Sequence, residues 1–307
     1  MSTRVNATLE LRARPPFSLV RTLHKKTLYG SDFYLGSPAE ARTADGLHTA
    51  MRLPSGSVVG FSLEQRKTTI LVRPGRRLTA RQRAELRLLL RWCLDLDRDL
   101  RPFYRLAKQR RVLDEATRAL RGMRVTRFPS VFEAALFAIA LQQTTGGRTH
   151  KMLVALAEKY GDAATVEGRP IHVLPDAKTL AGVPESELRR RTGLGFRAPY
   201  VKRLAETAAS GELPSYEQLE DEEPDAAEAA LRSLPGVGSH SVEVIGPQPA
   251  FPADSWSAPI LRRLLRLRPK DGDIVAAVKG FGARTFTDWQ RYSFDYLLNW
   301  SLNRAGG

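Results

Sequence analysis

The chain has 307 residues, 42% of them hydrophobic, and its 48 Lys and Arg against 33 Asp and Glu give a net charge of +15. This length predicts about two domains, and the apolar content excludes a disordered chain. A sequence pI of about 10.3 is typical of a domain that binds nucleic acid, although an arginine-rich coding habit would give the same charge. The sequence has neither a secretory signal nor an apolar run of about 18 residues, so we expect a cytoplasmic, nucleoid-associated protein without a membrane span.

Short β-branched or alternating runs, separated by turn signals, dominate the N-terminal part. They span residues 17–20, 47–53, 58–63 and 68–72. A helix is predicted from the N-cap Thr79 toward Leu96, because leucines recur on one face. These elements predict a small antiparallel sheet covered by at least one helix. The single cysteine, Cys93, excludes an internal disulfide and is expected to pack as a small apolar side chain.

Helical periodicity dominates beyond residue 103. The predicted helices span residues 131–140, 149–160, 185–191, 197–210, 225–233, 239–245, 260–267 and 289–302. Helices of about 8–16 residues with short links are typical of a compact helical domain. We therefore predict an α+β protein, with a mixed domain over residues 1–108 and an all-helical domain over residues 109–307. The acidic residues 220–223 are expected to lie in a solvated loop or at a helix entry.

The segment Leu-Pro-Gly-Val-Gly at residues 234–238 is a glycine turn that leads directly into a helix at Ser239. Glycines let the backbone turn sharply and let a ligand approach closely. The unpaired N–H groups at a helix start favour a phosphate, so Gly236, Gly238 and Ser239 are candidates to bind DNA phosphate. The same pattern is also typical of a tight corner between two helices.

An isolated aspartate, Asp254, follows in a Phe-Pro-Ala-Asp context. In a basic protein that binds nucleic acid, a fixed carboxylate at this place could do charge chemistry on the bound partner. The alternative is that Asp254 is the N-cap of the next helix. Both roles are compatible, since a carboxylate held at a helix start is well oriented.

These segments together resemble the helix-hairpin-helix (HhH-GPD) DNA glycosylases, most closely the 3-methyladenine DNA glycosylase II branch. The resemblance implies a hairpin at residues 226–246 and a catalytic region at residues 250–268, with Asp254 as the catalytic residue. A further match is Gly-Leu-Gly-Phe-Arg-Ala-Pro-Tyr-Val at residues 193–201, in which Arg197 and Tyr200 are expected to be structural. Some relatives carry an iron–sulfur cluster on four cysteines, which this chain cannot hold, and we expect no cofactor and no metal.

Two further positions of the family pattern concern the reaction and base flipping. Relatives that also cut the strand have a lysine two residues beyond the last hairpin glycine, where it forms a Schiff base. Here His240 occupies that position, which implies a monofunctional enzyme. His240 could contact phosphate, line the pocket or lie at a solvated helix start. The family's glutamine pair matches Gln142 and Gln143, with Gln143 as the wedge that replaces the flipped base and Gln142 as its support, or both as a polar helix end.

Alkylated purines are cationic and leave the sugar readily, so their excision needs little acid catalysis. A pocket for them needs mainly aromatic faces that stack on the positive base. The candidates are Trp256, Phe132 and Phe17, with a core position as the alternative for Trp256. We expect a monomeric base-excision-repair glycosylase that removes 3-methyladenine or related bases from double-stranded DNA. The alternatives are an 8-oxoguanine or uracil/hypoxanthine glycosylase, and a non-catalytic binder of damaged DNA. The segment between His240 and Asp254 is several residues shorter than in most relatives, which favours the last alternative, whereas the retained Asp254 opposes it.

Overall fold

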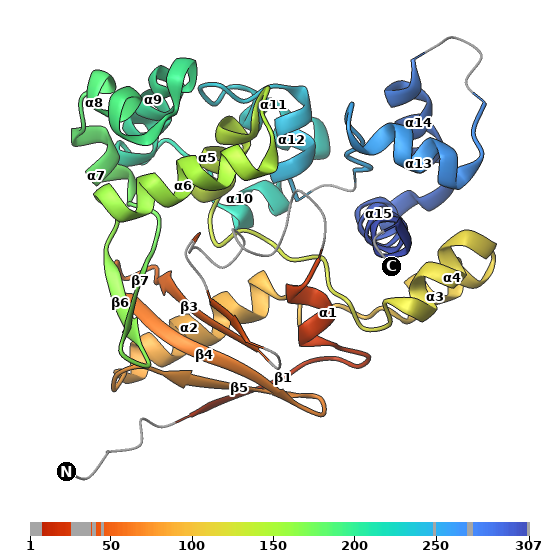
Figure 1. Ribbon diagram of the computed structural model, residues 1–307, viewed down its shortest axis with the longest axis horizontal. Coiled ribbons are helices and arrows are strands. Elements are labelled where there is room, and N and C mark those ends of the chain that lie inside the picture. The colour runs from red at the N-terminus through yellow and green to blue at the C-terminus, as the bar shows by residue number, and fades with distance from the viewer. Residues whose placement is uncertain are drawn as a thin grey trace.

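The computed structural model describes residues 8–25, 38, 41–43, 46–247, 250–268 and 273–305. Its N-terminal part is an antiparallel five-stranded sheet in the order β1-β5-β4-β3-β2. The strands are β1 (Leu9–Arg12), β2 (Ala41–Thr43), β3 (Gly46–Arg52), β4 (Val58–Arg66) and β5 (Thr69–Pro74). Figure 1 shows this sheet along one side of the molecule and most helices of the second domain on the other. The predicted antiparallel sheet is confirmed, although β1 and β2 were not predicted.

The helix predicted to begin after the N-cap Thr79 is α2 (Ala80–Cys93), which packs against the sheet. Thr79 and Gln82 form a capping box, in which each side chain accepts a hydrogen bond from the backbone N–H of the other residue. Leu86, Leu90 and Cys93 are fully buried in the N-terminal core. Burial raises the pKa of the Cys93 thiol well above its ordinary value. Cys93 therefore packs as a small apolar side chain, as predicted.

The strand predicted at residues 17–20 is wrong. Ser18 caps the short helix α1 (Leu19–Leu23), and its hydroxyl accepts a hydrogen bond from the backbone N–H of Arg21. Serine before an apolar run is an N-cap signal, and this local bond decides the conformation. Periodicity cannot distinguish a strand from a helix in a run of only about four residues.

The second domain is mostly helical. Its helices are α3 (Arg101–Lys108), α4 (Arg111–Ala119), α5 (Val131–Leu141), α6 (Gly146–Tyr160), α7 (Ala177–Gly182), α8 (Glu185–Thr192), α9 (Ala198–Ala209), α10 (Tyr216–Asp221), α11 (Pro224–Arg232), α12 (Ser239–Ile245), α13 (Ser257–Leu265), α14 (Ile274–Phe286) and α15 (Gln290–Ala305). All the helices predicted for this domain are present, with ends shifted by a few residues. Helices α3, α4, α7, α10 and α14 were not predicted.

A β-hairpin interrupts the helices and corrects the prediction of an all-helical domain. It consists of β6 (Ala163–Val166) and β7 (Arg169–His172), which pair antiparallel. Val166 and Ile171 pack with Ala50 of β3 in a small shared core, and Figure 1 shows the hairpin reaching from α6 to the sheet. Each strand has four residues, and β7 contains a proline, so the sequence carried almost no strand signal here.

Two hydrophobic cores define the domains. The N-terminal core includes residues from Leu9 to Leu96, whereas the larger core begins at Leu100 and includes Phe103 of α3. We therefore propose a boundary between Leu96 and Leu100, slightly before the predicted one at residue 108.

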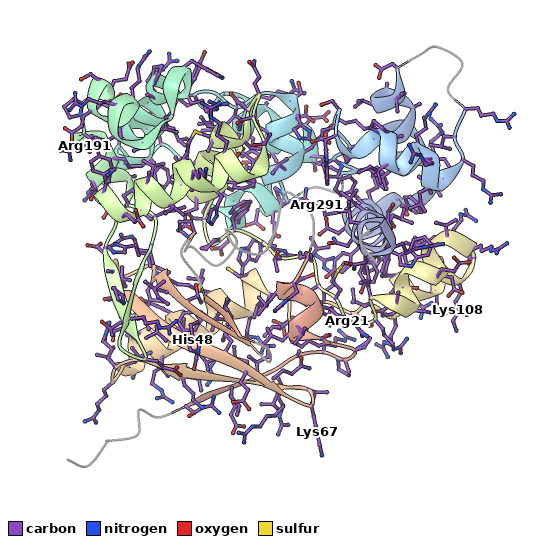
Figure 2. All side chains as sticks on the ribbon, viewed as in Figure 1. Arg21, His48, Lys67, Lys108, Arg191 and Arg291 are labelled. Carbon is purple, nitrogen blue, oxygen red and sulfur yellow. The ribbon has the colours of Figure 1, made fainter. Side chains whose placement is uncertain are left out.

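Basic side chains are spread widely over the surface. Figure 2 labels Lys108 and Arg191 at opposite ends of the helical domain, and Arg291 near its middle. Such a surface suits a polyanionic partner, whose binding would depend strongly on salt. In the part of the chain that the structure describes, no helix is long and apolar enough to cross a membrane.

Candidate active site and nucleic-acid interface

The glycine turn joins α11 to α12. Gly236 has a φ of +76°, a conformation that favours glycine. A side chain there would also collide with α9, because its Cβ would lie 2.8 Å from the Cβ of Tyr200. Gly238 and Ser239 are exposed at the start of α12. Since the first N–H groups of any helix lack intrahelical partners, this turn offers donors at the protein surface.

Gln142 and Arg197 tie this turn to the rest of the domain. The Nε2 atom of Gln142 donates a hydrogen bond of 2.5 Å to the carbonyl oxygen of Gly236. Arg197 in turn donates to the carbonyl oxygen of Gln142, from Nε at 3.1 Å and also from Nη2. The Arg197 side chain is only 6% exposed. The glutamine pair, the segment at residues 193–201 and the glycine turn therefore meet through side-chain to backbone bonds, which agrees with a structural role for Arg197 and Tyr200.

Gln143 has different surroundings from its neighbour. It is exposed, and its φ of +47° is a left-handed conformation that a non-glycine residue adopts only at a cost. The turn is held on one side by Gln142 and on the other by Thr145, which caps α6. The glutamine tied to Gly236 therefore supports a turn from which Gln143 projects to solvent.

Asp254 accepts hydrogen bonds from the turn that opens α13, close to the alternative interpretation of this residue, although the N-cap position itself is occupied by Trp256. Its Oδ1 accepts hydrogen bonds from the backbone N–H groups of Trp256 at 3.2 Å and Ser257 at 2.7 Å, and from the Ser257 hydroxyl at 2.6 Å. Ser257 is fully buried, whereas Asp254 is partly exposed. Among the described residues, Asp254 has no ion pair and its Oδ2 has no hydrogen-bond partner. One oxygen thus orients the carboxylate while the other is available for chemistry.

The chain just before Asp254 is anchored by Phe251. This buried ring stacks on Phe286 of α14 at 5.6 Å between centroids and meets Phe294 of α15 edge-on at 5.3 Å. Gly282 makes this packing possible, because a Cβ there would overlap the Phe251 ring. The short segment that leads to Asp254 therefore ends in a defined position, although residues 248–249 lie outside the described part.

His240 lies on α12 within an ionic group. Its Nδ1 is 3.7 Å from Glu243, whose carboxylate also pairs with Lys279 of α14 at 2.7 Å. Burial raises the pKa of Glu243, but the bonds from His240 and Lys279 outweigh it and hold this pKa below its ordinary value. Arg291 of α15 donates to the backbone carbonyl of Glu243 at 2.8 Å. Cationic side chains thus stabilise the C-terminal end of α12, where the helix dipole is negative.

The three aromatic side chains predicted to form the base pocket have different surroundings. Phe17 is buried in the N-terminal core. Phe132 lines a cleft near the start of α5. Trp256 is 39% exposed, two residues beyond Asp254. Trp256 therefore remains the predicted pocket residue nearest to Asp254 along the chain.

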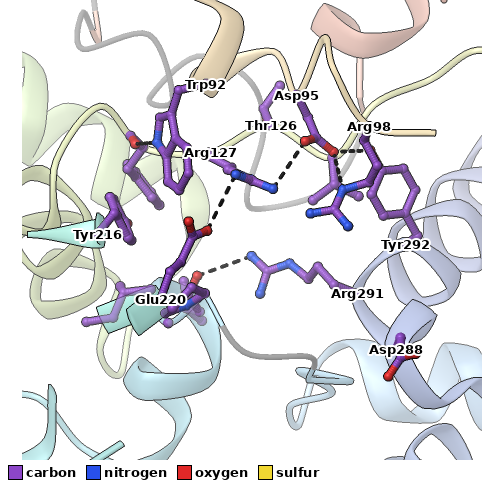
Figure 3. Close-up of a pocket in the computed structure, with 16 residues that line it drawn as sticks. Trp92, Asp95, Arg98, Thr126, Arg127, Tyr216, Glu220, Asp288, Arg291 and Tyr292 are labelled. Carbon is purple, nitrogen blue, oxygen red and sulfur yellow. Dashed lines mark hydrogen bonds and ion pairs between the residues drawn. The ribbon is translucent and has the colours of Figure 1, made fainter. Parts of the chain in front are cut away.

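Sequence reasoning missed a cavity of about 130 Å³ at the C-terminal end of α12 (Figure 3). The rings of Trp92 and Tyr216 form one wall, with centroids 5.1 Å apart, and the Arg127 guanidinium lies 4.2 Å from the centre of the Trp92 ring. Val244 and Arg291 line the cavity from α12 and α15. These residues come from elements far apart in the sequence, so no local pattern could have grouped them.

Buried charges organise the opposite wall of this cavity. The buried carboxylate of Asp95 pairs with Arg98 at 2.8 Å and with Arg127 at 3.1 Å. It also accepts a 2.5 Å hydrogen bond from the hydroxyl of Tyr292. Figure 3 shows Arg127 placed between Asp95 and Glu220, to which it pairs at 3.8 Å. The cavity therefore combines aromatic faces with balanced charges.

Residues 136–278 match the family model of the HhH-GPD superfamily base excision DNA repair proteins, and this range includes the glutamine pair, the glycine turn and Asp254. A DNA-3-methyladenine glycosylase of Bacillus subtilis (strain 168) is 29% identical over 212 residues, which cover 66% of this chain and 68% of that protein.

Solved structures share the whole fold. The 3-methyladenine DNA glycosylase from Archaeoglobus fulgidus aligns with a TM-score of 0.79 at 19% identity, over 96% of this chain and 98% of that chain. The 8-oxoguanine glycosylase/lyase of Clostridium acetobutylicum, solved in complex with double-stranded DNA containing cytosine opposite 8-oxoG, aligns with a TM-score of 0.66 at 17% identity, over 88% and 99%.

Over residues 136–278 the chain carries the domain of the HhH-GPD superfamily of base excision DNA repair proteins. Within this superfamily it is a DNA glycosylase, with an N-terminal antiparallel sheet followed by a mostly helical domain.

Proposed function

We propose that this glycosylase is monofunctional: it flips a damaged base out of double-stranded DNA, hydrolyses the N-glycosidic bond and leaves an abasic site. The observation that carries the proposal is the environment of Asp254. Its Oδ1 is held by two backbone N–H groups and a buried hydroxyl, and its Oδ2 has no partner among the described residues. A carboxylate that is already oriented stabilises developing positive charge without reorganisation.

Duplex DNA is held at the glycine turn. Backbone N–H groups at Gly236, Gly238 and Ser239 bind one phosphate, and His240 lies beside them at the helix start. Gln143 enters the gap that the flipped nucleotide leaves, while Gln142 keeps its place at Gly236. Extruding a base costs a few kcal/mol, least for a damaged base, so a side chain that fills the gap favours the flipped state.

The reaction breaks the bond between C1′ of deoxyribose and the base nitrogen, and the bonding electrons leave with the base. An alkylated base is cationic and leaves as a neutral molecule, so it needs little acid catalysis. Asp254 stabilises the positive sugar, and a water molecule then bonds to C1′ and gives up a proton. No covalent bond between the sugar and the protein forms in any of these steps.

The absence of strand cleavage is inferred from the residues on α12. His240 occupies the position at which strand-cutting relatives carry a lysine, and an imidazole does not form a Schiff base with the sugar. Among the described residues, Lys279 is the lysine paired to this helix, with its ammonium group 2.7 Å from the Glu243 carboxylate. Schiff-base chemistry needs a free amine, which this pairing opposes.

3-Methyladenine and related alkylated bases are the substrates that we propose. The 29% identity to a DNA-3-methyladenine glycosylase supports this choice. Trp256 and the cavity beside Trp92 and Tyr216 are our two candidates for the surface that receives the base. An 8-oxoguanine glycosylase is the second candidate, because one structural neighbour is an 8-oxoguanine glycosylase/lyase.

A panel of duplexes tests both parts of this proposal. Each duplex carries one lesion: 3-methyladenine, 8-oxoguanine, uracil or hypoxanthine. We expect base release from the alkylated duplex and an intact strand until the abasic site is cleaved by alkali. Release from 8-oxoguanine but not from alkylated DNA would refute the substrate. A product strand cut without alkali, trapped to protein by borohydride, would refute monofunctionality.

A further inference from the structure

A groove of about 840 Å³ lies between α4, α13 and α15, and Figure 1 shows α15 between the other two helices. Its floor is apolar and consists of Val112 from α4, Ile260 and Leu264 from α13, and Trp300 and Leu302 from α15. All of these side chains except Trp300 are partly exposed, although they pack against the larger core. The groove therefore presents apolar surface that the described part of the chain does not fully cover.

The rim of this groove is basic. Arg263 in the last turn of α13, Arg266 just beyond that helix and Arg304 near the end of α15 are exposed. Within the described ranges, none of these three side chains pairs with a carboxylate. Glu115 is the acidic residue in the lining, and it is already ion-paired with Arg111 at 3.2 Å. Three guanidinium groups around an apolar floor therefore remain available to an anionic partner.

The groove is separate from the residues to which we assign the reaction. Its lining contains no residue of the glycine turn, of the glutamine pair or of the segment from Asp254 to Trp256. Helix α13 begins at Ser257, beside Asp254, and Arg263 lies six residues farther along this helix, which corresponds to about 9 Å. The helix that starts at the proposed catalytic carboxylate thus carries a second surface toward its other end.

We propose that this groove docks an acidic amphipathic helix of a partner protein, with apolar side chains on the floor and carboxylates on the arginine rim. The Arg304 guanidinium lies 4.7 Å from the centre of the Trp300 ring, and a guanidinium that stacks in this way still presents its donors to a carboxylate. Amphipathic helices bind such grooves through apolar residues that share one face. A nucleic-acid backbone suits the groove less well, because it would pair with the arginines but leave the apolar floor in water, without the gain of about 25 cal/mol per Å² of apolar surface buried.

Fluorescence anisotropy of the full-length protein without DNA tests the groove independently of any glycosylase activity. The probe is a labelled peptide of about 16 residues, with leucines spaced to share one helical face and aspartate or glutamate at the other positions. We expect saturable binding. A scrambled peptide of the same composition, whose leucines no longer share a face, should bind at least about tenfold more weakly, because it cannot fill the floor while its carboxylates pair. Equal affinity for the two peptides would show that the protein responds only to net charge, and would overturn the proposal.

Charge reversal on the rim locates the bound peptide. Arg263→Glu and Arg304→Glu, on two different helices, should each weaken peptide binding at least about fivefold. The control is Arg262→Glu, which makes the same charge change at an exposed neighbour on α13 outside the lining and should weaken binding less than about twofold at physiological salt. The affinity for duplex DNA should be the same for Arg263→Glu and Arg262→Glu. Equal loss of peptide binding in the control would contradict the proposal, and weaker duplex binding by Arg263→Glu than by Arg262→Glu would assign this face to nucleic acid instead.

Discussion

The side-chain amide of Gln142 donates a 2.5 Å hydrogen bond to the carbonyl oxygen of Gly236, which lies 94 residues away in the sequence. This bond joins the end of α5 to the glycine turn. The residue proposed to fill the gap in the DNA, Gln143, is therefore connected through Gln142 to the turn proposed to bind a DNA phosphate. The two glutamines therefore have separate tasks that substitution can distinguish.

Gln142→Ala should destabilise the protein, whereas Gln143→Ala should not. The first change removes a partly buried hydrogen bond, which is worth about 1 kcal/mol, and also loosens the turn and weakens DNA binding. The second changes an exposed side chain, with an expected effect within about 0.5 kcal/mol on stability but a slower base release. Urea unfolding and single-turnover release measure both effects. The reverse order of stability would contradict the assigned roles.

The two glycines of the turn should respond differently to alanine. Gly236→Ala forces a φ of +76° on a residue with a Cβ and drives that Cβ against Tyr200, so we expect a loss of about 1–3 kcal/mol in stability. Gly238 has a φ of −98°, and a Cβ there meets no atom within 4 Å. Gly238→Ala should therefore change stability by less than about 1 kcal/mol and act on duplex affinity, because a methyl group would stand beside the bound phosphate. Equal melting temperatures for the two variants would count against this geometry.

Ser257 should act as a positioning residue for Asp254. Its buried hydroxyl donates to Oδ1 at 2.6 Å and accepts from the Asp254 N–H at 2.9 Å. Ser257→Ala is expected to cost about 1 kcal/mol in stability, and to lower the rate of base release while the affinity for an abasic duplex stays unchanged. A purely structural role would leave the single-turnover rate of the folded fraction at the value of the unmodified protein.

Glu133 should make the stability of the protein depend on pH. Burial raises its pKa to about 7 in the folded state against an ordinary value of 4.5, so the folded protein binds its proton more tightly than the unfolded chain. This contribution is complete below about pH 4.5 and is lost as the pH rises through 7, by up to about 3 kcal/mol. Thermal unfolding of the unmodified protein and of Glu133→Gln between pH 5 and 8 measures the difference. A stability difference that is constant over this range would contradict the raised pKa.

Local signals in the sequence predicted most of the regular structure. Thr79 forms the predicted cap, to which Gln82 adds a capping box, and Ser130 caps α5, because such bonds depend only on neighbouring residues. The strand at residues 17–20 failed because Ser18 caps a helix there. The hairpin β6–β7 is stabilised mainly by packing on the N-terminal sheet, which its own residues could not indicate.

In the candidate site, too, the local motifs could be predicted from the sequence and the tertiary contacts could not. The glycine turn, the glutamine pair and Asp254 were visible as motifs, whereas the bond that joins Gln142 to Gly236 depends on tertiary structure. The role of Ser257 could not be predicted, because serine is common near the start of a helix. Its proposed role depends on the hydrogen bonds that it donates to Asp254. The walls of the cavity come from Trp92, Tyr216 and Arg291, which lie on three helices and have no shared sequence pattern.

The most direct test of the central claim is single-turnover release of 3-methyladenine from a duplex by the unmodified protein and by Asp254→Asn. The asparagine oxygen can still accept the hydrogen bonds from Trp256 and Ser257 at the start of α13, so stability and affinity for an abasic duplex should be nearly unchanged. The loss of the charge should slow release by at least about 100-fold. Release at the same rate by both proteins would contradict a catalytic role for Asp254, and equal binding without release by either would identify a protein that recognises damage without removing it.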